Sequence, residues 1–402
     1  MRTRTLAIAL VAIFIASSML VMPTVKAQEN TQHKWLFLLY LNADNSLDVN
    51  AGAHHVPVVQ SDFEELMSVG STSDVAAYTL VDRVNGPANL YLFEKGSMKE
   101  MKDFSLNGKE ANMGDPATLR AFVDFTTTAS PADHVMLIFW DHGSPKLVSS
   151  DDHATATGGY DALTQWEVVQ ALSGFKVDVI GADECNVGHM EVAYEYSQGI
   201  QAQYLVAAET YTGWRGFPYD ALLRELTSNP TMTSREAAMM MVEQTQLLLD
   251  KPPYSGERIN SHSAFDLSKV PALADSMDAL SDLLVADMTN SINVISRARG
   301  IAQYCYGANA MNVVDLETLV REIGAGTSSK AIKDASAAVL ADLKDVVVAI
   351  HATGSTDHML GGLGIGFPNH MNEMSSYYPD FAFAKLCWQD LLEAYWAAHG
   401  CS

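Results

Sequence analysis

Short apolar runs alternate with amphipathic stretches through the first half of the chain, once the N-terminal residues are set aside. Runs such as residues 35–41 (WLFLLYL) and 135–140 (VMLIFW) lack polar alternation, which is typical of strands buried on both faces. The amphipathic stretches between such runs predict helices. Together they predict an α/β fold with a mostly parallel sheet covered on both faces. The predicted strands are 35–41, 75–81, 90–93, 135–140, 177–182 and 204–208, and the predicted helices are 61–69, 116–125, 164–172 and 187–196.

The second half of the chain has a different pattern. From about residue 220 it becomes largely helical, and a glycine-rich run ending at Phe367-Pro368 predicts one returning strand. Lys251-Pro252-Pro253 marks the expected boundary. We therefore expect an α/β core over 28–250 and a helical region over 251–402 packed on it. The long helical stretches are 233–249, 270–289 and 328–349.

The N-terminal residues have the features of an export signal. Arg2 and Arg4 precede an apolar run over 6–22, and a small residue, Ala27, follows shortly afterwards. A basic start, an apolar stretch and a small residue at the exit predict a signal peptide over residues 1–27. The alternative is an uncleaved anchor, because the apolar run approaches the shortest length that spans a membrane. We expect a secreted or cell-envelope protein.

Composition narrows the class of partner. The 402 residues include 25 Lys and Arg against 48 Asp and Glu, for a net charge of −23, and 48% are hydrophobic. Such a chain can bury a sizeable core. Nucleic acid is not an expected partner, because phosphate binding needs clustered Lys and Arg. The acidic balance instead favours cationic partners, including basic peptides.

The chain contains four cysteines: Cys185, Cys305, Cys387 and Cys401. A disulfide-rich scaffold would need many more. Cys387 and Cys401 are close in sequence and could pair, but pairing depends on geometry that spacing does not provide. Cys305 belongs to no motif and is interpreted as a buried structural thiol.

Two of the predicted strands end in reactive side chains. The strand over 135–140 runs into His142, and the strand over 177–182 runs into Cys185. The carboxyl ends of parallel strands meet at one edge of a sheet, and the intervening segment is long enough for a crossover helix. Taken singly, a histidine or cysteine is more often structural. Their paired placement predicts a nucleophile beside its base.

The chemistry of that pair explains the residue types. A free thiol has a pKa near 8.5, so a neighbouring imidazole is needed to accept its proton and return it to the leaving amine. The amides of Gly143 and Cys185 are candidates for binding the developing oxyanion. A helix directly after Cys185 is expected to place a positive dipole end near the sulfur.

At these residues the chain resembles a known family, the clostripain-like cysteine peptidases (peptidase family C11) of the caspase-like clan. The resemblance runs from about Trp35 to Trp396. The stretches that carry it are 40–48 (YLNADNSLD), 140–143 (WDHG), 183–185 (DEC) with 188–194 (GHMEVAY), 209–219 (ETYTGWRGFPY), the glycine-rich strand ending at 368 and the closing helix over 388–395.

The resemblance implies a caspase-like α/β/α sandwich and a secreted endopeptidase with a Cys–His dyad. His142 matches the base and Cys185 the nucleophile. Asp183 matches an acidic residue implicated in binding basic side chains, which implies cleavage of peptides and proteins after Arg or Lys. Asp183 could instead cap the next helix. The alternative function is a catalytically silent member of the same fold that binds peptides or cell-surface partners.

The residues flanking Cys185 depart from the family pattern. Glu184 and Asn186 stand where the family usually has a small and an apolar residue. The added carboxylate could raise the pKa of the thiol by repulsion, or it could join the specificity pocket. In both cases Glu184 would affect how strongly the protein prefers to cleave after Arg or Lys.

No cofactor is expected. Calcium dependence is known for some members, but Asp44, Asp48, Asp151 and Asp152 do not have EF-hand spacing and are interpreted as turn and capping residues. The sequence also lacks a zinc-hydrolase H-E-x-x-H motif. His189, just after Cys185, is interpreted as a packing residue.

The first prediction concerns self-processing, which members of this family commonly perform at a basic residue between the dyad partners. Lys146 and Lys176 are the only Lys or Arg residues between His142 and Cys185. We therefore expect no self-cleavage within residues 147–175. Mass spectrometry of the purified protein tests this, and a cut there in the wild type but not in Cys185→Ala would contradict it.

Overall fold

The computed structural model describes residues 32–49, 58–155, 159–252, 260–304, 312–353, 360–374 and 378–400. The chain divides into Met1–Thr31 and a compact unit, Gln32–Ser402, and the description below concerns the second. The predicted signal peptide, Cys305 and Cys401 lie outside the described residues. Among the residues that are described, no helix is both long and apolar enough to cross a bilayer.

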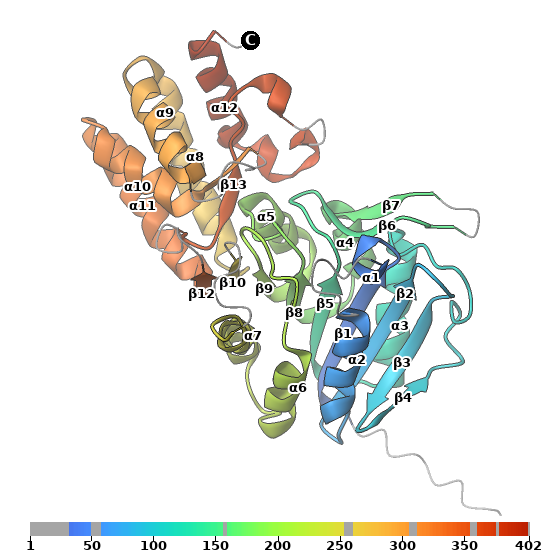
Figure 1. Ribbon diagram of the computed structural model, residues 1–402. Helices are drawn as coiled ribbons and strands as arrows, with labels where there is room; N and C mark the ends of the chain where they lie inside the picture. Colours follow the sequence, from blue (N-terminus) through green and yellow to red (C-terminus); the bar gives the residue numbers. More distant parts are fainter. Residues whose placement is uncertain are drawn as a thin grey trace, which may run out of the picture. The chain divides into compact units, whose positions relative to one another are not determined.

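One large sheet organises the fold (Figure 1). Its central strands, from β9 to β2 in the order below, are parallel, and the strands at both edges are antiparallel. The predicted mostly parallel α/β sheet is confirmed. Along the sheet the nine strands are β12 (Val347–Thr353), β10 (Asn260–Asp266), β9 (Gln201–Ala207), β8 (Lys176–Asp183), β5 (Ala132–Trp140), β1 (His33–Ala43), β2 (Val75–Arg83), β3 (Asn89–Glu94) and β4 (Ser97–Glu100).

The central strands are buried on both faces, as their unbroken apolar runs predict. In β1, Leu36 and Leu38 belong to one buried cluster, whereas Phe37 and Leu39 belong to another on the opposite face. Helices on each side complete these two layers. On one side lie α2 (Val58–Val69), α6 (Tyr219–Ser228) and α7 (Ser234–Leu249), and on the other α3 (Pro116–Ala129), α4 (Gln165–Leu172), α5 (Met190–Gly199) and α8 (Val270–Ala286).

The C-terminal region is largely helical, as predicted. The expected returning strand exists as β13, but it pairs antiparallel with β11 in a separate small sheet rather than joining the central one. A second small sheet pairs β6 (Leu147–Asp151) with β7 (Asp161–Thr164). The remaining elements are α9 (Met288–Tyr304), β11 (Val313–Asp315), α10 (Leu316–Gly326), α11 (Lys330–Val346), β13 (Gly364–Gly366), the 3-10 turns Met371–Glu373, Tyr378–Asp380 and Phe383–Lys385, and α12 (Cys387–Ala398).

Two predicted helices in this region were wrong in extent. The stretch 328–349 is a helix only to Val346, after which the chain becomes β12 and pairs antiparallel with β10. Consecutive β-branched valines at 346–348 favour that change. The stretch 270–289 ends its first helix at Ala286, because the Asp287 amide closes the last turn onto Leu283 and Val285. Neither β10 nor β12 was predicted from the sequence.

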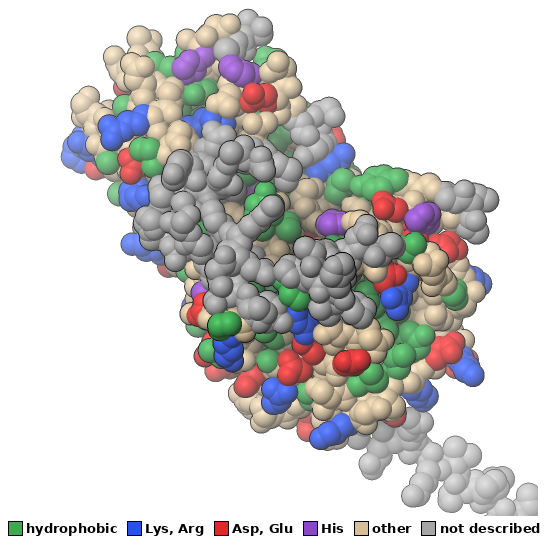
Figure 2. All heavy atoms as spheres, viewed as in Figure 1, with side chains coloured by type: hydrophobic (Ala, Val, Ile, Leu, Met, Phe, Trp, Pro, Cys, Tyr) green, Lys and Arg blue, Asp and Glu red, His purple; other side chains and the backbone are tan. Residues whose placement is uncertain are grey.

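The pairing of β5 with β8 positions the candidate residues. These strands are parallel neighbours with Trp140 opposite Asp183, which confirms that His142 and Cys185 leave adjacent strands at one edge. On the face shown in Figure 2, the Lys and Arg side chains of the described residues are scattered among Asp and Glu rather than gathered in one stripe.

Candidate active site

A cavity of about 240 Å³ lies at the carboxyl edge of β5 and β8, and both His142 and Cys185 line it. The two reactive side chains thus share one solvent-accessible space. Within the described part of the chain, no hydrogen bond joins them directly. Each side chain instead forms a hydrogen bond with a different neighbour. These neighbours and burial together determine the protonation state of each side chain.

The imidazole of His142 is held by a serine. Its Nε2 lies 2.9 Å from Oγ of Ser46, the first residue of the short helix α1 (Ser46–Val49) after β1. Burial lowers the pKa of His142, partly opposed by the charge of Asp152. The ring is therefore neutral at neutral pH and able to accept a proton. Sequence reasoning did not single out Ser46, although it lies within the 40–48 stretch.

The thiol of Cys185 is held by the backbone of Thr212. The Thr212 amide donates to Sγ at 3.4 Å, and Sγ donates to the Thr212 carbonyl at 3.9 Å. Burial raises the pKa of the thiol, and the charges of Glu184 and Asp183 raise it further, while the Thr212 amide opposes them. The resting pair is thus a neutral thiol and a neutral imidazole rather than an ion pair.

The prediction that a helix starts directly after Cys185 is wrong. Helix α5 begins only at Met190. Before it, the Asn186 amide donates to the Thr210 carbonyl and the Gly188 amide donates to Ala208, so this segment follows the chain that leaves β9. The sulfur consequently contacts the amide of Thr212 rather than a helix terminus.

Asp183 lines the same cavity and is only 5% exposed. Its Oδ2 accepts hydrogen bonds from the Phe217 amide at 2.9 Å and the Tyr219 hydroxyl at 2.7 Å. Its Oδ1 has no partner among the described residues. Burial raises the pKa of Asp183 to about 6, against the effect of those two bonds. Asp183 does not cap the next helix, because His189 occupies the N-cap of α5.

Gly216 leaves room beside that carboxylate. Its φ of +64° lies in the left-handed region, and a Cβ there would lie 2.3 Å from Asp183 Oδ2. Gly213 and Trp214 line the cavity with it. The neighbouring Arg215 does not neutralise Asp183, because it forms ion pairs with Asp62 and Glu65 of α2. Arg215 and Gly216 belong to the 209–219 stretch that carries the resemblance, but the sequence did not predict which residues they would contact.

Glu184 is buried next to the reactive pair, and it also lines the cavity. Its Oε1 accepts from the Ser149 amide at 3.3 Å, and burial together with the charge of Asp141 holds the pKa of Glu184 well above its usual range. A Cβ on Gly143 would lie 2.7 Å from Glu184 Oε2, so a side chain at Gly143 would displace Glu184. Glu184 therefore raises the pKa of Cys185 and contributes to the cavity wall, and its part in a specificity pocket stays a prediction.

Three of the four carboxylates considered for calcium have protein partners. Asp44 pairs with His153 at 2.7 Å, and Asp48 pairs with Arg83 at 2.6 Å. Asp151 accepts from the backbone amide of Met113 at 2.9 Å. Across the described residues, no group of three or more His, Cys, Asp or Glu side chains is arranged to hold a metal ion.

The fold and its cysteine-bearing cavity are those of a cysteine peptidase, and comparisons with known proteins identify the family. The profile of the clostripain family, peptidase family C11, matches residues 40–396. Clostripain from Hathewaya histolytica is 24% identical over 417 aligned residues, covering 88% of this chain and 78% of the relative. The chain therefore belongs to the clostripain family of cysteine peptidases.

Two solved structures of C11 proteases share this fold. One is an inactive zymogen C11 protease from Parabacteroides distasonis, with a TM-score of 0.65, 17% identity, and coverage of 88% of this chain and 98% of that one. The other is a secreted C11 cysteine protease from Bacteroides thetaiotaomicron in complex with an irreversible peptide inhibitor, with a TM-score of 0.65, 18% identity, and coverage of 90% and 99%. These likenesses confirm the predicted caspase-like sandwich.

The neutral resting pair leads to a prediction about thiol reactivity. Because the pKa of Cys185 is raised, its alkylation by iodoacetamide should rise about tenfold per pH unit through the neutral range. Glu184→Gln removes a carboxylate whose charge opposes the thiolate, so it should speed alkylation at the pH values at which Glu184 is ionised. Peptide-resolved mass spectrometry measures both rates.

Cys387 supplies an internal comparison for that experiment. A hydrogen bond with Asp282, aided by burial and by Asp278, raises the pKa of Cys387 to about 12. It should therefore react more slowly than Cys185 throughout. A rate for Cys185 that stays level from pH 6 to pH 8 would instead indicate a preformed thiolate–imidazolium pair.

Proposed function

We propose that this peptidase is an exported endopeptidase that cleaves after Arg or Lys, with Cys185 as nucleophile and His142 as base. The observation that carries the proposal is that both side chains line a cavity whose wall also holds Asp183, with a buried and unpartnered carboxylate oxygen. The cavity thus combines a nucleophile, a base and an acceptor for a cationic side chain.

Cleavage begins with proton transfer within the resting pair. In the tautomer in which His142 Nε2–H donates to Ser46 Oγ, the lone pair of the ring is on Nδ1, which accepts the proton of the Cys185 thiol as the sulfur attacks the peptide carbonyl. The amides of Gly143 and Cys185 stabilise the tetrahedral oxyanion. When the C–N bond breaks, His142 returns the proton to the departing amine.

Hydrolysis of the thioester completes the cycle. The same imidazole takes a proton from water, whose oxygen attacks the thioester carbonyl, and then protonates the sulfur as the C–S bond breaks. In both acylation and hydrolysis, the same nitrogen of His142, Nδ1, accepts the proton and returns it. Ser46 is a positioning residue, because it holds the tautomer that presents Nδ1.

Selectivity is assigned to Asp183. A guanidinium or ammonium donor would complete the hydrogen bonding of Oδ1, and a buried charge pair of this kind strongly favours the matching ligand. The pKa of Asp183 is about 6 in the free enzyme, so its carboxyl is protonated below that pH. Affinity for a basic side chain should therefore fall as the pH drops through 6.

Export and independence from metals are also part of the proposal. The basic and apolar N-terminal pattern supports export with loss of residues 1–27, as does similarity to a C11 protease described as secreted. Peptides and proteins are the proposed partners, nucleic acid is not, and membrane contact would arise only through an uncleaved leader. A thiol and an imidazole carry every step, so no calcium or other cofactor is required.

The dyad is tested by substitution in the mature protein. Cys185→Ala and His142→Ala should each lower kcat/KM on Arg- and Lys-terminated fluorogenic peptides by at least about 10³-fold, because each removes a participant in every bond change. Cys387→Ala is the matched control and should retain activity. The wild type should remain active in EGTA. Absence of turnover with any peptide under reducing conditions would favour the silent peptide-binding alternative.

Selectivity is tested separately. Asp183→Asn should lower kcat/KM for Arg and Lys substrates by at least about 30-fold, since a buried charge partner is lost. Cleavage after neutral residues should change little. Asp220→Asn, which removes an acid from the adjacent helix α6, should leave both unchanged. An unaltered basic preference in Asp183→Asn would refute the assignment.

A further inference from the structure

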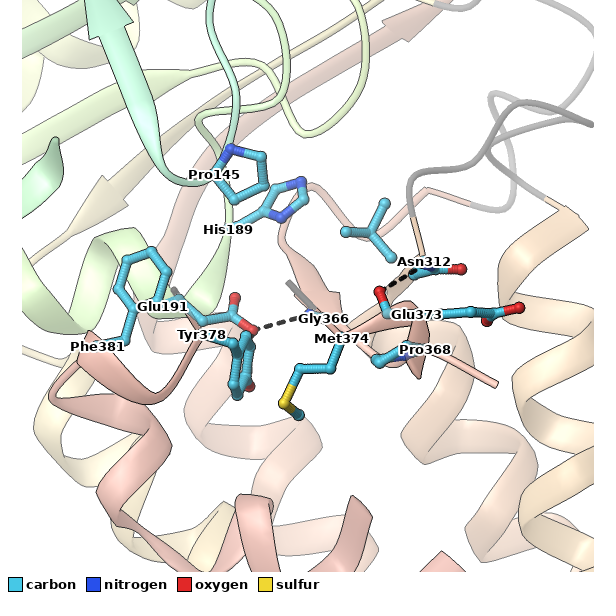
Figure 3. A pocket seen from close by; sticks show the side chains of 11 residues that line it. Pro145, His189, Glu191, Asn312, Gly366, Pro368, Glu373, Met374, Tyr378 and Phe381 are labelled. Carbon is cyan, nitrogen blue, oxygen red and sulfur yellow. Dashed lines mark hydrogen bonds between the residues drawn. The ribbon is translucent and has the colours of Figure 1, made fainter. Parts of the chain in front are cut away.

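A second cavity, of about 360 Å³, lies apart from the residues that line the first (Figure 3). It is enclosed by the start of α5, by β13 and by the turns that precede α12. Its volume is within the range of about 300–1,000 Å³ that is usual for small-ligand sites. Much of its wall is apolar, and the apolar side chains are Pro145, Val313, Pro368, Met374, Tyr378 and Phe381.

The carboxylate of Glu191 reaches this cavity from α5 while being only 1% exposed. Its Oε1 accepts from the Gly366 amide at 2.9 Å and from the Tyr378 hydroxyl at 3.1 Å. Its Oε2 has no partner among the described residues. In Figure 3 one Glu191 oxygen is bonded to Gly366, and the other points to the side on which His189 lies. One buried and unpartnered carboxylate oxygen thus belongs to a residue that lines the cavity.

His189, which we interpreted as a packing residue, is buried and supplies a second acceptor without a partner among the described residues. Its Nε2 lies 3.1 Å from the Glu209 carbonyl oxygen, which can only accept, so Nε2 carries the hydrogen. Burial lowers the pKa of His189 to about 4, so the ring is neutral. Its Nδ1 is then a lone-pair acceptor, and it too is buried with no partner in the described part of the chain.

Buried acceptors without donors are rare in folded proteins, because each loses its hydrogen bonds to water. Here two of them border one cavity, and no Lys or Arg is among the residues known to line it. A second carboxylate, that of Glu373, is also in the lining. The complementary ligand is a positively charged hydrogen-bond donor on an apolar stem.

We propose that this cavity is a second binding site, for an alkyl guanidinium or ammonium group held by Glu191 Oε2 and His189 Nδ1. A free amine and a basic side chain of a bound peptide share this chemistry. Both catalytic segments contribute to the site: Pro145 lies in the loop that begins with His142, and His189 lies on the segment that follows Cys185. Only the case in which a bound peptide supplies the cation depends on the proposed proteolytic function.

Binding is tested with n-butylguanidine, and n-butyramide serves as the uncharged comparison. Calorimetry uses the mature Cys185→Ala/Asp183→Asn protein, in which the proposed specificity site no longer competes. We expect one saturable site that prefers the cation at least tenfold. Adding Glu191→Gln should weaken binding at least tenfold, because the amide keeps an acceptor for Gly366 but turns a donor toward the cation. Adding Glu243→Gln, which removes an exposed acid on α7, should have no effect.

Crystals of the Cys185→Ala/Asp183→Asn protein with n-butylguanidine give a readout that does not depend on the folding of Glu191→Gln. We expect ligand nitrogens within hydrogen-bond distance of Glu191 Oε2 and His189 Nδ1. Water alone at those atoms, or no saturable binding in solution, would overturn the proposal. Either result would leave the role of Asp183 untouched, since Asp183 is tested by peptide cleavage.

Peptides with one cleavable Arg identify the source of the ligand. A second Arg, or citrulline in its place, is set at each flanking position in turn. If the peptide supplies the cation, the second Arg should lower KM in the wild type but not in Glu191→Gln. If KM is the same for Arg and citrulline while n-butylguanidine still binds, the source is a free amine. Binding to the cavity is supported in both cases.

Discussion

The parallel pairing of β5 with β8 is the constraint on which the site depends. Because Trp140 lies opposite Asp183, the chain leaves both strands at one edge and at nearly the same level. His142 and Cys185 thereby border one cavity, although no hydrogen bond joins the two side chains among the described residues. The same pairing places Asp183 and Glu184 at that edge, so the proposed catalytic residues and the acidic residues are brought together by one pair of strands.

Burial then determines the charge state of the site. Asp183 and Glu184 both lose hydration there, which raises the pKa of each, and their charges oppose thiolate formation at Cys185. Burial also lowers the pKa of His142. At rest, the thiol of Cys185 and the imidazole of His142 are therefore both neutral. A basic side chain beside Asp183 would offset this acidity, so substrate charge and nucleophile activation are linked by the same electrostatics.

The departures of the C-terminal region from prediction have a common physical origin. Strands β10 and β12 form at the sheet edge, where pairing with a neighbour, rather than a long apolar run, stabilises them. Helix α5 starts later than expected because backbone hydrogen bonds from Asn186 and Gly188 to the segment after β9 hold these residues outside the helix. In both cases partners distant in sequence outweighed local preference.

The sequence by itself determined the buried strands, an α/β fold with a mostly parallel sheet, and the strand ends that carry His142 and Cys185. Those features follow from hydrophobic pattern and residue order, which are local. Only the tertiary structure decided that Thr212 holds the sulfur, that Ser46 holds the imidazole, and that one oxygen of Asp183 remains open. Hydrogen-bond partners and desolvation depend on atoms brought together from distant segments, and no local pattern encodes them.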